Sequence, residues 1–327
     1  MAGGFLVVSD SFKGTLSAVE VADAIGRGIE AAGGTAKLLP AADGGEGTAD
    51  ALMRRRGGEM RTAPAHDPLG HPLEARYALL GDGRTAAVEV ASASGLALVD
   101  ENDRDAEEAS TRGTGELIAA AIAAGARRVL VAAGGSASTD GGAGAIEALE
   151  AAGGLHGAHL EVLCDVATPF ERAAEVYAPQ KGADPDTVAR LTRRLIAQAG
   201  ALPRDPRGRA LTGAAGGLAG GLWAAFGARL VPGAAFVLGV LGFDRLLEDA
   251  GGVVTGEGRL DEQIREGKLV GELARRCRAA GVPLYAIAGE VALAPERLRE
   301  LGIAGVREAG TPADIERAAA ALARPAA

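Results

Sequence analysis

The chain has 327 residues, of which 48% are apolar and 24% are charged, and its formal net charge is −9. This length is enough for about two domains of roughly 150 residues each. The longest run of basic residues near the start is Arg54–Arg56, and no basic stripe occurs. Because phosphate neutralisation supplies most of the affinity for nucleic acid, this charge balance argues against a nucleic-acid partner.

Cysteine content and apolar runs indicate the compartment. The two cysteines, Cys164 and Cys277, have no metal-type spacing, which is typical of a protein of the reducing cytoplasm without a disulfide framework. The N-terminus lacks the basic region and long apolar run of a signal peptide. Residues 211–228 are uncharged and could be read as a membrane span, but their six glycines favour a buried, closely packed helix, so we expect no membrane association.

Short apolar runs alternate with helical patterns along the chain. A buried strand is predicted at 4–10 and is followed by a helix over 17–33, which a capping box of Ser17 and Glu20 opens. Further predicted strands are 35–40, 127–135, 253–258, 283–289 and 303–310, and further predicted helices are 47–57 and 113–126.

This alternation predicts an α/β fold with a mostly parallel sheet covered on both faces. One segment departs from the pattern. Residues 76–91 form two alternating runs around Gly81-Asp82-Gly83, which predicts an antiparallel hairpin. We therefore expect a second, mixed α/β domain inserted into the first.

Ligands of parallel α/β sheets bind beyond the carboxyl ends of the strands. Polar residues and glycines follow nearly every predicted strand. They are Asp10, Ser11 and Lys13; Asp43, Gly44, Gly45 and Glu46; Asp165; and Glu257, Arg259, Asp261, Gln263 and Lys268.

The stretch "GGSASTDGGAG", residues 134–144, lies at another such strand end. Backbone N–H groups of a glycine turn at a helix N-terminus can bind an anion, so Gly134, Gly135 and Ser136 are predicted to bind phosphate or a carboxylate. The alternative interpretation is a tight turn in which Asp140 caps the next helix. Neither GxxxxGK[ST] nor GxGxxG occurs in the chain.

Phosphoryl transfer requires a group that accepts the hydroxyl proton, cations that stabilise the transferred group, and Mg²⁺. Asp10, Asp43, Asp165 and Asp261 are candidates for the base or the metal ligands, and Lys13, Lys181, Arg259 and Lys268 are candidate cations. Each has a plainer interpretation as a strand end, a helix cap or a charged loop. The histidines show no HExxH spacing and no GxSxG elbow is present, so hydrolysis has no support.

Eight motifs in order carry a resemblance to a known family. They are "SDSFKGTLSA", "PAADGGEGT", "RGTGELI", "GGSASTDGGAGA", "CDV", "APQKGAD", "GAAGGL" and "TGEGRLDEQIREGK". Over nearly the whole chain, the sequence resembles the glycerate kinase type I family. The resemblance implies a cytoplasmic enzyme that phosphorylates D-glycerate with ATP, with the 2-hydroxyl favoured. It also implies a flavodoxin-like domain of residues 1–62 and 250–327, an inserted domain of residues 63–249, and an active-site cleft between them.

The hypotheses for individual residues follow from these motifs. Asp43 or Asp261 accepts the hydroxyl proton, and Lys13, Arg259 and Lys268 offset charge. Asp165 or Asp10 lies near Mg²⁺. Phosphate or substrate contacts are assigned to Asp10, Ser11, Gly44, Gly45, Glu46, Gly134, Gly135, Ser136, Asp140, Lys181, Glu257 and Gln263. The expected partners are ATP and D-glycerate, with a homodimer as one option for the oligomeric state.

The chain also departs from the family pattern. Thr139 and Thr168 stand where that pattern usually has Asn, and the spacing between Asp165 and Pro179 is short. Two alternatives therefore stay open: a kinase for another small hydroxy acid, and a sensor that binds nucleotide or metabolite without turnover.

Overall fold

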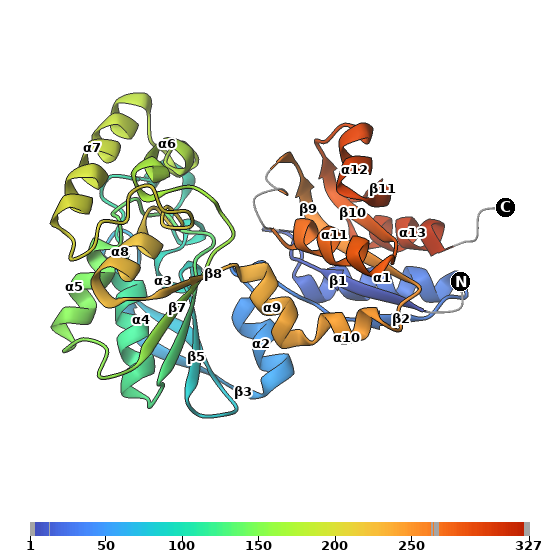
Figure 1. Cartoon of the computed structure of the whole chain (residues 1–327), viewed down its shortest axis with the longest axis horizontal. Helices are drawn as coiled ribbons and strands as arrows, with labels where there is room; N and C mark the ends of the chain where they lie inside the picture. The colour runs from blue at the N-terminus through green and yellow to red at the C-terminus, as the bar shows by residue number, and fades with distance from the viewer. Residues whose placement is uncertain (1–3, 13, 263, 265–267, 324–327) are drawn as a thin grey trace. The chain divides into compact units, whose positions relative to one another are not determined.

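The computed structural model describes residues 4–12, 14–262, 264 and 268–323. The chain forms two compact units (Figure 1). The terminal unit comprises residues 1–43 and 234–327, and the central unit comprises residues 44–233. A discontinuous unit and one continuous segment were expected, with boundaries at 62/63 and 249/250. In the structure the division falls at 43/44 and 233/234.

The terminal unit is built on a five-stranded parallel sheet in the order β11-β10-β9-β1-β2. Renumbered along the unit, this is the 2-1-3-4-5 order of flavodoxin-like folds, so the predicted fold class is confirmed. The strands are β1 (Phe5–Ser9), β2 (Ala36–Leu38), β9 (Gly252–Leu260), β10 (Leu284–Val291) and β11 (Ile303–Glu308). The helices are α1 (Ala18–Ala31), α9 (Gly233–Leu241), α10 (Phe243–Leu247), α11 (Leu269–Ala280), α12 (Pro295–Leu301) and α13 (Pro312–Ala323).

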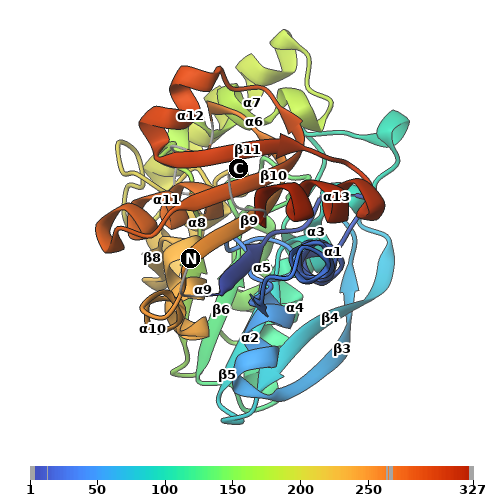
Figure 2. The ribbon, with the colours of Figure 1, turned by 90° about the vertical axis from the view of Figure 1, so that its right-hand side faces the viewer.

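Helix α1 shows how the sequence specifies this unit. The predicted capping box is present, with the Ser17 hydroxyl accepting from the Glu20 N–H and the Glu20 carboxylate accepting from the Ser17 N–H. Ile25 and Ile29 of α1 are fully buried against the sheet and α13. Gly28 lets the two helices approach closely, because a Cβ there would lie 2.2 Å from the Glu316 carbonyl oxygen of α13 (Figure 2).

The central unit contains a six-stranded mixed sheet in the order β3-β4-β5-β6-β7-β8. Strands β3, β4 and β5 pair antiparallel, and β5 also begins the parallel part of the sheet, which continues through β6, β7 and β8. They are β3 (Gly58–His66), β4 (Pro72–Leu80), β5 (Thr85–Glu89), β6 (Arg128–Ala132), β7 (His159–Leu163) and β8 (Arg229–Val231). The helices are α2 (Thr48–Arg56), α3 (Ala91–Ser94), α4 (Arg112–Ala123), α5 (Ala143–Ala151), α6 (Ala173–Tyr177), α7 (Pro185–Ala201) and α8 (Leu218–Phe226), with 3-10 turns at Leu96–Leu98, Glu101–Asp103, Phe170–Arg172 and Pro179–Lys181.

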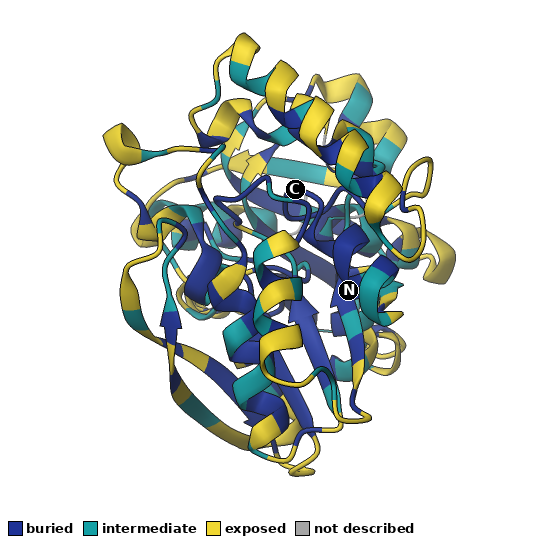
Figure 3. Ribbon diagram, turned by 90° about the vertical axis from the view of Figure 1, so that its left-hand side faces the viewer, coloured by how far each residue is buried: buried dark blue, intermediate teal, exposed yellow. Residues whose placement is uncertain are grey.

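The predicted hairpin is confirmed as β4 and β5. Asp82 fixes its turn by accepting hydrogen bonds from the Arg84 and Thr85 N–H groups and from the Thr85 hydroxyl. Strand β3 was not predicted. It contains Pro64, which cannot donate to a ladder and is tolerated here because β3 is an edge strand. The buried parallel strands lie at the centre of this unit (Figure 3).

Residues 211–228 are buried as predicted, but they do not form one helix. Helix α8 spans only Leu218–Phe226, and the residues before it turn tightly, with positive φ at Leu211, Ala215, Gly216 and Gly217. The buried side chains of Leu218 and Leu222 join the core of the central unit. Among the described residues, the structure contains no helix that is long and apolar enough to cross a membrane.

Candidate active site

Strands β1 and β9 form the topological switch point of the terminal unit. From β1 the chain crosses over to β2 on one side, and from β9 it crosses over to β10 on the other. The Asp10 N–H donates to the Gly256 carbonyl at 3.0 Å, so the predicted residues Asp10 and Glu257 lie at the same edge of the sheet. Asp10 is buried, and its carboxylate accepts from the Ser11 N–H at 2.7 Å. Such an edge is where ligands bind in this fold.

The segment leading to Asp43 runs beside the end of β1. The Leu39 N–H donates to the Val7 carbonyl and the Ala41 N–H to the Ser9 carbonyl, at 2.8 and 2.9 Å. The half-buried Asp43 follows two residues later. The structure therefore brings Asp43 to the same end of the sheet as Asp10.

Arg259 and Asp261 continue along the same edge from β9. Arg259 is 58% exposed, and its guanidinium lies 3.2 Å from the Glu290 carboxylate and 3.7 Å from that of Asp261. The carboxylates of Asp261 and Glu290 therefore already balance part of the Arg259 charge. Asp261 was a predicted site residue, whereas Glu290 was not. Lys268 is the residue before α11. Lys13 and Gln263 lie outside the described residues.

In the central unit, two glycine turns far apart in sequence meet backbone to backbone. A Cβ on Gly134, after β6, would lie 2.6 Å from the Gly45 Cα. A Cβ on Gly44 would lie 2.8 Å from the Gly233 Cα, after β8. The Gly233 N–H in turn donates to the Asp165 carboxylate, after β7, at 2.7 Å. These contacts join the ends of three neighbouring parallel strands, and a larger residue at Gly134 or Gly44 would force the neighbouring backbone to move.

Lys181 lies beneath the 134–140 loop, where it is only 2% exposed. Its ammonium donates to the Ser136 hydroxyl at 2.9 Å and to the Ser138 carbonyl at 2.5 Å. Burial lowers the pKa of Lys181 to about 7, although the nearby Asp140 carboxylate opposes that shift. Lys181 therefore supports the loop from inside, where its amine contacts Ser136.

Asp140 caps a helix, as the alternative interpretation of the glycine-rich stretch predicts. Its carboxylate accepts four hydrogen bonds, from the Gly142 and Gly144 N–H groups at the start of α5 and from the Thr111 N–H and hydroxyl at the start of α4. The start of α5 is therefore occupied by a protein carboxylate. The other end of the loop lies in different surroundings from the start of α5. Gly135 is exposed, and Ser136 pairs with Gly95 in an isolated antiparallel β-bridge.

Glu89, at the end of β5, is a polar strand end that the sequence analysis missed. It accepts a hydrogen bond from the Ala49 N–H in the first turn of α2. Ala49 lies three residues after the exposed Glu46, which ends the Asp43–Glu46 turn. The rule that polar residues follow parallel strands would have found it, but β5 was read only as half of a hairpin. Burial raises the pKa of Glu89 to about 7, and the Asp50 and Glu46 carboxylates add to that rise.

The two threonines that replace the usual asparagines are both built into the central unit. Thr139 is fully buried, and its hydroxyl has no hydrogen-bond partner among the described residues. The Thr168 hydroxyl lies 2.8 Å from the Tyr177 hydroxyl.

The carboxylates do not form a ready metal cage. Within the described part of the chain, no group of three or more His, Cys, Asp or Glu side chains could hold a metal ion. Single carboxylates such as those of Asp10 and Asp165 fit Mg²⁺ that arrives with a nucleotide, because Mg²⁺ is usually held by one or two carboxylates together with substrate phosphates.

The chain is similar to known proteins over nearly its whole length. The model of the glycerate kinase family matches residues 5–156 and 150–325. The glycerate kinase of Bacillus subtilis (strain 168) is 38% identical, covering 91% of this chain and 88% of that protein. The glycerate 2-kinase of Escherichia coli (strain K12) is 35% identical, covering 88% and 85%.

A solved structure is also similar. A crystal structure from Salmonella typhimurium LT2, of a protein given the provisional name glycerate kinase 2, superposes with a TM-score of 0.79 at 34% identity. The match covers 98% of this chain and 97% of that one. Sequence and fold thus point to the same family.

Proposed function

The chain belongs to the glycerate kinase family, and we propose that it transfers the γ-phosphoryl group of ATP to D-glycerate. The observation that carries the proposal is the extent of the family match, which includes the strand ends of both units. Those ends present carboxylates, which can accept a proton or bind Mg²⁺, and glycine turns, whose backbone N–H groups can bind phosphate.

We place the transferred group on the 2-hydroxyl of glycerate. The support is the resemblance of the motifs, together with the similarity to a protein named glycerate 2-kinase. Asp43 or Asp261 accepts the proton of the attacking hydroxyl, while the backbone at Gly134–Ser136 holds ATP phosphates or the substrate carboxylate. Lys13, Arg259 and Lys268 offset the negative charge that the two substrates bring together.

Asp10 or Asp165 would hold Mg²⁺, which neutralises phosphate charge when it is bound with ATP. Asp165 is oriented for this by its hydrogen bond from the Gly233 N–H, and Asp10 by its hydrogen bond from the Ser11 N–H.

The proposal is tested by measuring ADP release with D-glycerate, lactate and tartronate as acceptors. We expect kcat/KM to be highest for D-glycerate, the acceptor in the name of the matching family. All three acceptors carry a hydroxyl next to a carboxylate, but lactate has a methyl group and tartronate a second carboxylate where glycerate has its hydroxymethyl group. A preference for lactate or tartronate would identify a kinase for another hydroxy acid. Tight ATP binding together with no ADP release for all three acceptors would identify a sensor.

A further inference from the structure

We propose that Glu89 is a positioning residue of this reaction, which holds the Asp43–Glu46 turn in place through the first turn of α2. The inference rests on the proposed function, since it assigns Glu89 to the turn that carries a candidate base.

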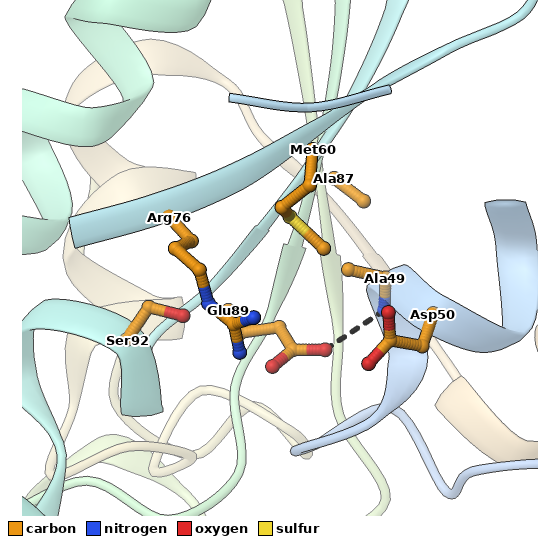
Figure 4. Close-up of a pocket in the computed structure, with 7 residues that line it drawn as sticks. All are labelled: Ala49, Asp50, Met60, Arg76, Ala87, Glu89 and Ser92. Atoms are coloured by element: carbon orange, nitrogen blue, oxygen red, sulfur yellow. Dashed lines mark hydrogen bonds between the residues drawn. The ribbon is translucent and has the colours of Figure 1, made fainter. Parts of the chain in front are cut away.

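The first step of the argument is the contact between Glu89 and the turn. Glu89 Oε1 accepts from the Ala49 N–H at 2.8 Å (Figure 4). Ala49 is the second residue of α2, and residues 43–47 lead directly into that helix. The Gly47 backbone also hydrogen-bonds the same carboxylate. Glu89 is therefore attached to the segment that continues from Asp43.

The second step is the charge around the carboxylate. Glu46 from the turn and Asp50 from α2 both lie close enough to oppose ionisation of Glu89. Arg76 of β4 lies on the other side of Glu89, and the uncharged Ser92 of α3 completes the surroundings (Figure 4). Three carboxylates thus share the space around one helix N-terminus.

The third step is the cost of this arrangement. A helix cap needs only an acceptor oxygen, which a glutamine would supply without ionisation. At Glu89, partial burial and the two neighbouring carboxylates instead destabilise the charged form of the side chain, as the rise of its pKa to about 7 indicates. Such costs are typical of functional sites, where position and charge matter more than stability.

The consequence is a turn whose anchoring depends on the ionisation of Glu89. The carboxylate makes a stronger, charge-assisted hydrogen bond to the Ala49 N–H than the neutral acid does. We expect log kcat to rise with pH through about 7, since the ionised form holds the turn and its candidate base more firmly.

The experiment compares Glu89→Gln with the parent and with Asp50→Asn, which removes one negative charge nearby but no hydrogen bond to the turn. We expect Glu89→Gln to stay folded, to lose at least about tenfold in kcat and to lose the rise near pH 7. Asp50→Asn should keep the maximal kcat but show the rise at lower pH, because a carboxylate that opposes ionisation of Glu89 is gone.

Two kinetic results would overturn the assignment. One is a Glu89→Gln enzyme within about twofold of the parent in kcat with an unchanged pH profile. The other is a rise near pH 7 that Asp50→Asn does not move. Hydrogen exchange at the Ala49 N–H gives a readout without turnover. Measured well above pH 7, where Glu89 is ionised in the parent and in Asp50→Asn, we expect faster exchange in Glu89→Gln and unchanged exchange in Asp50→Asn. Equal exchange in all three proteins would contradict the proposal. A parent that released no ADP with any acceptor would contradict the proposed function instead, and the exchange result would still decide whether Glu89 holds the turn.

Discussion

Lys181 shows what a single buried side chain does for the glycine loop. Its amine contacts the Ser136 hydroxyl and the Ser138 carbonyl, so two points of the loop are fixed from inside the core. A nonpolar side chain of similar length would fill the space but leave both acceptors without this donor. We therefore assign Lys181 an effect on loop position and on the pH dependence of stability.

The pH dependence has a definite sign. The pKa of Lys181 is about 7 in the folded protein against an ordinary value of 10.5, so between these values the unfolded chain binds more protons. The cost of burying the charge is fully present below about pH 7 and is relieved as pH rises toward 10.5, so this residue makes stability rise over that range. In Lys181→Met we expect the dependence to be absent.

Urea denaturation of the parent and Lys181→Met at about pH 7 and about pH 9 measures this difference. As pH rises from about 7 to about 9, the free energy of unfolding of the parent should increase relative to that of the variant by up to about 1.4 kcal/mol per pH unit. Parallel stability curves for the two proteins over this range would contradict this account, because they would show that Lys181 stays protonated in the folded protein and that burial does not lower its pKa.

At the scale of elements, Asp140 joins α4 and α5. One carboxylate satisfies N–H groups at the start of both helices, which explains why the glycine-rich loop ends in an acid. Asp140→Ala should lower the free energy of unfolding by about 2–4 kcal/mol, because two helix starts lose their acceptor. Asp184→Ala, which removes a single exposed cap from α7, is the matched control and should cost less. Equal losses in the two variants, measured by urea denaturation, would refute the shared-cap account.

The approach of Gly134 to Gly45 links two further elements, the loop after β6 and the turn before α2. In Gly134→Ala the new methyl group would lie 2.6 Å from the Gly45 Cα, so one of the two turns has to move. We expect kcat to fall about 10²-fold, because displacement of a catalytic turn by about 1 Å has effects of that size.

Gly200→Ala is the control for this glycine. It lies in α7, where an added Cβ meets no atom within 4 Å, and alanine should favour the helix there. We expect the control to keep full activity and to unfold at a slightly higher urea concentration. A Gly134→Ala enzyme as active as Gly200→Ala would remove the glycine contact from the account of catalysis.

At the scale of the whole molecule, the sequence predicted the secondary structure at the strand ends well. Apolar runs bounded by glycine and acids located β1, β6, β9, β10 and β11, and Ser17 with Glu20 located the start of α1. Local signals of this kind act over a few residues, so they are visible in one sequence. The tight turns at 211–217 were missed because glycine and alanine suit a turn and a packed helix equally well.

The site was less predictable, because its contacts join residues distant in sequence. Asp140 reaches Thr111, Gly134 reaches Gly45, and Glu89 reaches Ala49. No local pattern distinguishes an aspartate that caps two helices from one that contacts a phosphate. The strand-end rule selected Asp10 and Asp165 as candidates but did not select Glu89, because the order of strands in the central sheet was not foreseen.

The most direct test of the proposed function is phosphorus NMR of the product formed from ATP and D-glycerate. We expect one new phosphate ester whose signal is split by the single proton on carbon 2, together with an equal amount of ADP. A signal split by the two protons of carbon 3 would contradict the proposed position of transfer. ATP that stays intact beside D-glycerate would contradict the kinase activity itself.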